Sequence, residues 1–182
     1  MAELDVDALS DLLAREKIRD CIGRIARGED RRDAALLSAS FWPDAACDFG
    51  VFSGTFGDYL AWVVPGSPAI PVTQHVLGQS VIARRGNSAL VETHVTAYHR
   101  INMGTEERDI MIGGRYLDRF EERGDEWRIV GRTMLYDWFQ DVGVSADWSH
   151  GLMGMKFSAD HYTGRAAGDH SVAFFGKGLP GP

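Results

Sequence analysis

The sequence predicts a single domain of the α+β class, with helices in the first third of the chain and an antiparallel sheet after them. Apolar residues recur at helical spacing before residue 64, and hydrophobicity alternates with a period of two from residue 73 onward. Short turns separate the alternating segments, which is typical of a meander of antiparallel strands. Helices followed by a meander favour packing of the helices on one face of the sheet.

The composition of the 182-residue chain suits one globular domain with a sizeable core, since 45% of the residues are hydrophobic and 25% are charged. No stretch approaches the roughly 18 to 20 consecutive apolar residues of a membrane span. Acidic residues stand near the N-terminus, where a signal peptide has Lys or Arg followed by an apolar run. The sequence therefore predicts a cytoplasmic protein that has no membrane partner.

The charge and the cysteines exclude further classes of protein. The net charge of −7 argues against a nucleic-acid partner, because such a partner requires a basic surface. Cys21 and Cys47 lack CxxC spacing and a secreted context, so we expect two reduced thiols that pack in the interior.

The first element is expected to be a helix over residues 5–27. Ile18, Ile22 and Ile25 belong to one apolar stripe at helical spacing. An aspartate at position 5 or 7 can cap the start of this helix, and Gly28 is expected to end it. The elements expected next are a helix over 30–40 with Asp30 or Asp33 as its cap, a strand over 45–52, a helix over 57–64 and a proline-rich loop over 65–71.

Four strands with two-residue periodicity form the predicted meander. They are expected over 73–83, 89–102, 108–121 and 126–137, with turns at 84–88, 103–107 and 122–125. Together with the helices they make a predicted domain over residues 1–141. Residues 142–182 are rich in glycine, so we expect an irregular tail that belongs to the same domain or reaches a neighbouring subunit.

The signature motifs of several enzyme classes are absent from the sequence. There is no glycine-rich nucleotide fingerprint, P-loop, HExxH, EF-hand loop or GxSxG elbow. His94 and His99 lie five residues apart on a predicted strand, so their side chains face opposite ways and cannot bind one metal ion. The sequence therefore predicts no metal site and gives no positive support for nucleophilic hydrolysis.

Three polar residues near the ends of predicted elements are the remaining candidates for chemistry. Asp30 follows the first helix, His75 begins the first long strand and Arg132 lies within the last strand. Each also has a structural interpretation. Asp30 can cap the next helix, His75 can be a structural histidine, and Arg132 can be the buried partner of Asp30 or of another carboxylate. Composition and spacing alone do not decide between these interpretations.

The order of several motifs resembles that of SnoaL-like proteins in the nuclear transport factor 2-like superfamily. The segment IMIGGRYLDRFEERGDEWRIVGR (110–132) is similar to their late hairpin, with a small-residue pair, an aromatic residue, a charged turn, Trp and Arg. GEDRRD (28–33), FWPDA (41–45) and TQHVLGQ (73–79) are similar to earlier segments of the family in the same order. The resemblance covers about residues 8–140. It is strongest to the branch with scytalone dehydratase, hexachlorocyclohexane dehydrochlorinase and bile-acid dehydratase.

The resemblance implies a cone, in which a curved antiparallel sheet packs against N-terminal helices and the open end holds an apolar pocket. It also implies elimination of water or HCl from a cyclic substrate by an Asp–His pair without a cofactor. Asp30 and His75 stand at the matching positions. Arg132 matches a basic residue in the pocket of the dehydrochlorinase and the bile-acid enzyme.

The chemistry of this implied catalytic set is coherent. His75 titrates near physiological pH and suits the role of base. A buried Asp30 would hydrogen-bond the other ring nitrogen, fix the tautomer and stabilise the imidazolium. Arg132 stays protonated, so it would hold an anionic leaving group or a developing enolate.

Two departures from the family pattern concern the leaving group. Ile25 stands where some members have a Lys or Tyr. No tyrosine precedes Tyr59, although scytalone dehydratase binds a catalytic water with two tyrosines. His94, Tyr98 or His99 could compensate from the second long strand.

The residues expected to line the pocket follow from alternation and from the resemblance. They form an apolar, aromatic lining that suits a flat or cyclic molecule, and each has ordinary core packing as its alternative. The set is Phe49, Thr73, Ile112, Tyr116, Met134, Tyr136 and Trp138.

We therefore expect a cofactor-independent lyase or isomerase that acts on a small cyclic hydrophobic substrate. A second hypothesis is a non-catalytic ligand-binding or assembly subunit that resembles the small subunits of ring-hydroxylating dioxygenases. A third, a ketosteroid-isomerase-like proton shuttle, lacks a matched set of acids or a tyrosine. All three predict a homo-oligomer, either a dimer or a trimer, because the outer face of the sheet carries few charges over 89–97 and needs a cover.

Overall fold

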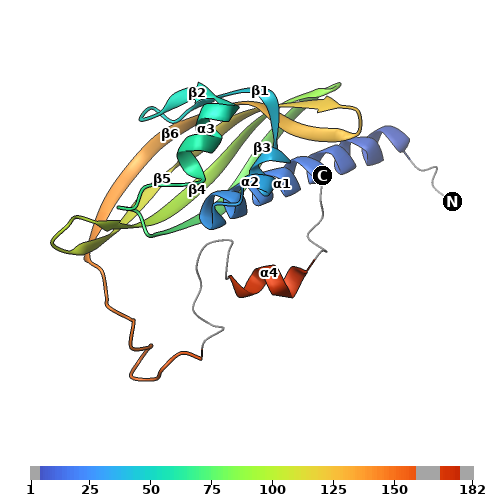
Figure 1. The fold of residues 1–182 in the computed structure, drawn as a ribbon. Coiled ribbons are helices and arrows are strands. Elements are labelled where there is room, and N and C mark those ends of the chain that lie inside the picture. The colour runs from blue at the N-terminus through green and yellow to red at the C-terminus, as the bar shows by residue number, and fades with distance from the viewer. Residues whose placement is uncertain (1–4, 159–168, 177–182) are drawn as a thin grey trace.

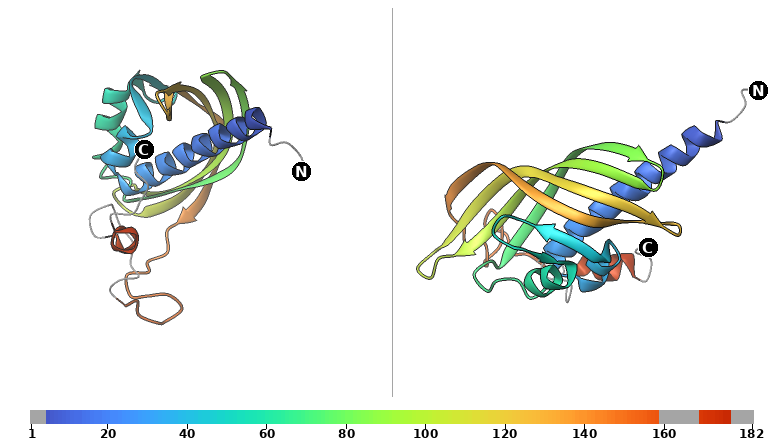
Figure 2. Two further views of the ribbon diagram at one scale, coloured as in Figure 1. Left: turned by 90° about the vertical axis from the view of Figure 1, so that its right-hand side faces the viewer. Right: turned by 90° about the horizontal axis from the view of Figure 1, so that it is seen from above.

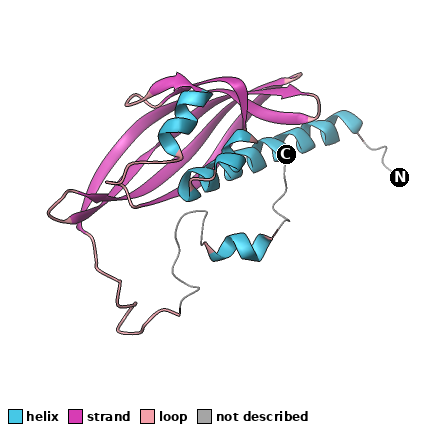
Figure 3. Ribbon diagram, in the orientation of Figure 1, coloured by secondary structure: helices cyan, strands magenta, loops and turns pink. Residues whose placement is uncertain are grey.

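The computed structural model describes residues 5–158 and 169–176 and confirms the α+β class (Figures 1 and 3). Its helices are α1 (Val6–Arg31), α2 (Ala34–Ser38), α3 (Phe56–Val63) and α4 (His170–Phe175). Its strands are β1 (Phe41–Asp48), β2 (Ser53–Thr55), β3 (Val72–Arg85), β4 (Ser88–Asn102), β5 (Glu107–Arg123) and β6 (Glu126–Val144). The sheet curves toward α1, which runs along one face of it (Figure 2).

The six strands form one sheet in the order β2-β1-β6-β5-β4-β3. Strands β3 to β6 make the predicted antiparallel meander. β1 pairs with β6 in parallel, which the antiparallel prediction did not include. The connection from β1 runs through β2, α3 and the proline-rich loop to β3 at the opposite edge, and the meander then brings β6 back beside β1. A parallel pair needs such a long connection.

α1 continues beyond its predicted end at residue 27. Asp5 caps its start, as predicted, by accepting a hydrogen bond from the amide of Ala8. The helix ends at Arg31, and Arg32 adopts the left-handed conformation with φ of 53°. Gly28 therefore does not end the helix, and that prediction is wrong. The extension places residues 29 and 30 on the last turn of α1.

Gly28 instead permits the close approach of α2 to α1. A Cβ atom added at Gly28 would lie 2.9 Å from Cδ2 of Leu37, which is fully buried. A Cβ atom added at Gly23, on the same helix, would meet nothing within 4 Å.

These two glycines give opposite predictions for stability. We expect Gly28→Ala to lower the free energy of unfolding by about 1–3 kcal/mol, because the new methyl group overpacks the contact with Leu37. We expect Gly23→Ala to raise it by about 0.5–1 kcal/mol, because alanine loses less backbone entropy than glycine in a helix. Urea denaturation of both variants measures the difference, and equal effects at the two positions would contradict the packing role of Gly28.

The residue that caps α2 is Asp33 and not Asp30. Asp33 is the N-cap and accepts hydrogen bonds from the amides of Ala35 and Leu36. The expected helix over 30–40 is therefore limited to residues 34–38, and Phe41 already begins β1. The cap prediction is confirmed for Asp33, whereas Asp30 lies on α1.

The core lies between α1, α3 and the sheet. Aromatic rings stack in it, with centroids 5.0 Å apart for Phe41 and Phe56 and 5.3 Å apart for Phe49 and Tyr59. Both cysteines are buried free thiols, as predicted. Burial raises the pKa of Cys21 to about 11 and that of Cys47 to about 12, so neither thiol is a reactive nucleophile.

The tail contains the short helix α4, where the sequence predicted only irregular structure. Two polar contacts connect α4 to the last turns of α1. Nε of Arg31 lies 2.7 Å from Oδ2 of Asp169, and Nη2 of Arg27 donates a 3.0 Å hydrogen bond to Oγ of Ser171. Within residues 5–158 and 169–176, no helix combines the length and the hydrophobicity that a membrane crossing requires.

Candidate active site

Asp30 and His75 form a closed hydrogen-bonded pair between α1 and β3. Nδ1 of His75 lies 2.7 Å from Oδ1 of Asp30. The backbone amide of His75 also donates to both carboxylate oxygens, at 3.1 and 3.0 Å. Because the carboxylate accepts at Nδ1, this nitrogen carries a proton, and Nε2 is the atom available to a ligand.

Glu29 is the third ionisable member of this site, and the sequence interpretation missed it. It is buried with 6% of its surface exposed, and its Oε2 lies 3.6 Å from Nε2 of His75. Its Oε1 accepts a hydrogen bond from the hydroxyl of Tyr59 and lies 3.7 Å from Nη1 of Arg132. Burial, followed by the charge of Glu29, holds the pKa of Tyr59 well above its ordinary value, so this hydroxyl remains a donor.

A signal for Glu29 was present in the sequence. The apolar stripe of α1 runs through Ile18, Ile22 and Ile25, and the next position on that stripe is 29. Ending the predicted helix at residue 27 removed Glu29 from the buried stripe.

Arg132 is fully buried and pairs with Asp118. Its Nε and Nη2 donate to the two carboxylate oxygens of Asp118, both at 2.8 Å, and neither side chain is accessible to solvent. The guanidinium carbon also lies 4.0 Å from the ring centroid of Tyr116. The sequence left open whether Arg132 binds an anion in the pocket or pairs with a buried carboxylate. This arrangement supports the second interpretation, and the carboxylate is Asp118 rather than Asp30.

Asp118 was also missed, although its position carries a signal. It stands directly opposite Arg132 in the pairing of β5 with β6. Asp118 lies two residues from both Tyr116 and Phe120 on β5, so its side chain shares their buried face of the strand. A carboxylate on the buried face of a strand requires a partner.

The charges around His75 favour its protonated form. Burial lowers the pKa of His75, but Glu29 and Asp30 outweigh it, and the pKa lies above the ordinary value of 6.5. The positive charge of Arg132 lowers the pKa of His75, but by less than the two carboxylates raise it.

His99 on β4 is a second imidazole on the inner face of the sheet. Its ring centroid lies 5.9 Å from that of His75. Burial, together with the charge of His75, lowers the pKa of His99 to about 4, so His99 is neutral near pH 7. Its Nδ1 is buried and has no hydrogen-bond partner within the described part of the chain. His94 is exposed and lies 3.8 Å from Oε1 of Glu92.

The expected lining residues fall into two groups. Phe49, Tyr116 and Met134 are buried, and Ile112 packs at the edge of the same core. Thr73 lies opposite His99 in the pairing of β3 with β4. These five residues lie on the inner side of the sheet with the Asp30–His75 pair.

The other two expected lining residues are about half exposed. Tyr136 donates a 2.8 Å hydrogen bond to the carbonyl of Phe49. Trp138 lies over Gly113, where an added Cβ atom would meet its indole at 1.9 Å. Since Gly113 and Tyr116 face opposite sides of β5, Trp138 lies on the outer side of the sheet. The pairing of β5 with β6 shifts register between Gly113 and Gly114, which pair with Trp138 and Tyr136. Because of this irregularity, Trp138 and Tyr136 face opposite sides of the sheet although they are two residues apart.

A cavity of about 320 Å³ adjoins the pair between α1 and β3. Its lining consists of Gly23, Ala26, Arg27, Asp30, Arg31, His75 and Leu77, so none of the seven residues expected to line the pocket borders this cavity. Within residues 5–158 and 169–176, no group of three or more His, Cys, Asp or Glu side chains is arranged to hold a metal ion.

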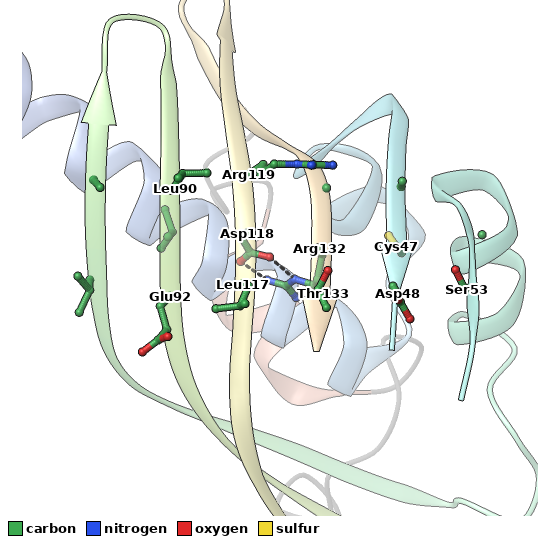
Figure 4. A pocket seen from close by; sticks show the side chains of 16 residues that line it. Cys47, Asp48, Ser53, Leu90, Glu92, Leu117, Asp118, Arg119, Arg132 and Thr133 are labelled. Atoms are coloured by element: carbon green, nitrogen blue, oxygen red, sulfur yellow. Dashed lines mark hydrogen bonds and ion pairs between the residues drawn. The ribbon is translucent and has the colours of Figure 1, made fainter. Parts of the chain in front are cut away.

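A larger hollow of about 650 Å³ lies across the outer face of the sheet (Figure 4). Leu90, Leu117 and Thr133 border it, and the pair of Asp118 and Arg132 lies beneath them. α1 lies behind the sheet in this view, so the hollow is separate from His75.

A family model described as a SnoaL-like domain matches residues 10–133, which is most of the chain. The chain belongs to the SnoaL-like family. This confirms the resemblance found in the sequence. No curated protein matches this SnoaL-like chain at a significant level.

Solved structures share the fold of this SnoaL-like chain at low identity. A hexachlorocyclohexane dehydrochlorinase from Novosphingobium barchaimii is 19% identical with a TM-score of 0.66, over 83% of this chain and 98% of that one. A putative scytalone dehydratase from Novosphingobium aromaticivorans is 19% identical with a TM-score of 0.65, over 81% and 98%. A nuclear transport factor 2-like protein from Salmonella enterica is 16% identical with a TM-score of 0.61, over 73% and 97%. These similarities establish the fold.

Proposed function

We propose that this SnoaL-like chain is a cofactor-independent lyase, of the dehydratase or dehydrohalogenase type, or an isomerase, that acts on a small cyclic hydrophobic substrate. The observation that carries the proposal is the 2.7 Å hydrogen bond between Asp30 and Nδ1 of His75. It gives the imidazole one tautomer and directs Nε2 to the reaction. Two structural relatives, a hexachlorocyclohexane dehydrochlorinase and a putative scytalone dehydratase, support elimination as the reaction class.

In the proposed reaction, Nε2 of His75 takes a proton from a substrate carbon. The electron pair of that C–H bond forms a C=C bond, and a hydroxide or halide leaves the neighbouring carbon. A leaving hydroxide takes the proton from the imidazolium of His75 and becomes water, whereas after the loss of a halide the imidazolium releases that proton to solvent. Asp30 stabilises the imidazolium that forms.

His99 is the group best placed to assist the leaving group. It lies beside His75, it is neutral near pH 7, and a neutral imidazole can donate one hydrogen bond. The complete burial of Arg132 against Asp118 supports a positioning role for the arginine instead of direct contact with a leaving group.

The test is a screen of cyclic hydroxy and halo compounds for formation of an alkene. We expect turnover by the wild-type chain and its loss in His75→Ala. The matched control is His94→Ala, which removes an exposed histidine from the outer face and should leave turnover unchanged. Equal turnover by wild type and His75→Ala would contradict the proposal.

The alternative is a non-catalytic ligand-binding or assembly subunit, and the outer face of the sheet favours it. The hollow across that face exposes the apolar side chains of Leu90 and Leu117. Exposed apolar surface of this kind commonly marks an interface. We propose a homo-oligomer, dimer or trimer, under either function. The alternative predicts an assembled chain with no turnover of any compound in the screen.

A further inference from the structure

We propose that Glu29 is a positioning residue that makes His75 a stronger base; the inference rests on the proposed elimination. The imidazole lies between two carboxylates that approach different ring nitrogens. Asp30 accepts the hydrogen bond from Nδ1, and Oε2 of Glu29 lies 3.6 Å from Nε2. The second carboxylate therefore stands beside the atom that takes the proton.

The surroundings of Glu29 hold its carboxylate in this place. Oε1 accepts the hydrogen bond from Tyr59 on α3, and Nη1 of Arg132 on β6 lies 3.7 Å away. Oε2 is buried and accepts no hydrogen bond from the residues that the structure describes. A buried carboxylate oxygen without a donor is costly. A proton on Nε2 of His75 would supply that donor.

The charged groups that shift the pKa of His75 come from α1 and β6, and Arg27 and Arg31 of α1 also line the cavity beside it. Asp30 and Glu29 come from α1 and favour the imidazolium, whereas Arg132 from β6 opposes it. His99 from β4 is neutral near pH 7, as is Tyr59 from α3. A base with a higher pKa is stronger, but it is unprotonated only at higher pH. Glu29 therefore makes His75 a stronger base. It also lowers the activity at low pH, because a larger fraction of His75 is then protonated.

The test is Glu29→Gln, which removes the charge and keeps an oxygen that can accept from Tyr59. We expect the NMR titration midpoint of His75 to move to lower pH. The pH–rate curves of wild type and variant should cross. Below the wild-type midpoint the variant retains more of its maximal rate, and on the high-pH plateau it is slower, because its base is weaker. A merely structural defect would lower the rate at every pH.

Three further variants make the test specific. Tyr59→Phe removes the hydrogen bond to Glu29 but keeps the charge, so the midpoint of His75 should stay closer to the wild-type value than in Glu29→Gln. Glu29→Asp withdraws the carboxylate and should give an intermediate midpoint, which also serves if Glu29→Gln does not fold. Glu92→Gln removes a glutamate beside His94 and should leave His75 unchanged.

Two results would overturn the inference: an unchanged midpoint of His75 in folded Glu29→Gln or Glu29→Asp, or pH–rate curves that fall in parallel. The titration needs no substrate. Failure of the proposed function would appear separately, as the absence of turnover by the wild-type chain.

Discussion

Replacing Asp118 with Asn is expected to lower the free energy of unfolding by about 3–5 kcal/mol. Asp118 and Arg132 are both inaccessible to solvent and share two hydrogen bonds of 2.8 Å. The variant would leave the guanidinium charge in the core with only the more distant Glu29, at 3.7 Å, as a compensating carboxylate. Chemical denaturation of wild type and variant measures the loss.

Two controls separate the buried pair from ion pairs in general. Asp141 pairs with Arg108 on the surface, where 42% and 30% of the two side chains are exposed. Asp141→Asn should cost no more than about 1 kcal/mol. Replacing both buried partners together, as Asp118→Leu with Arg132→Met, should cost less than Asp118→Asn, because no unpaired charge remains. A loss below about 1 kcal/mol for Asp118→Asn would contradict the structural role of the pair.

Asp30→Asn is expected to lower the elimination rate by about 10²- to 10⁴-fold, the range of an acid–base contribution and of the loss of an orienting aspartate. The asparagine has one oxygen where the carboxylate has two, and both accept from the His75 backbone amide. It also lacks the charge that stabilises the imidazolium. Single-turnover kinetics on a compound from the screen measures the effect.

The control for this variant is Asp33→Asn. Asp33 caps α2 three residues farther along, and asparagine is an equally good N-cap. Its rate should therefore stay within twofold of wild type. A similarly small effect of Asp30→Asn would show that Asp30 does not orient a catalytic base.

The four meander strands β3 to β6 could be predicted from the sequence, because the alternation along them reflects burial of one face. β1 begins at Phe41 rather than at the predicted residue 45, and β2 was not predicted. The end of α1 could not be predicted. Gly28 has the residue type of a helix stop, but its contact with Leu37 in α2 gives it a packing role that only the tertiary structure reveals. That error hid Glu29, which lies on the last turn.

The candidate site was only partly accessible from the sequence. Asp30 and His75 are 45 residues apart, and periodicity contains nothing that brings them together. The resemblance to SnoaL-like proteins supplied that pairing. Glu29 and Asp118 were missed because charged residues are expected at the surface, and only the partners that surround them make their burial tolerable.

The most direct test of the account is an NMR titration of the six histidines in the wild-type chain and in Asp30→Asn, with His75→Ala to assign the signal. The account predicts that His75 titrates above its ordinary pKa of 6.5 and moves to lower pH when Asp30 is neutralised. It also predicts that His99 titrates near a pKa of about 4. A His75 signal that titrates as a free imidazole and ignores Asp30→Asn would contradict the coupled pair, and with it the proposed elimination.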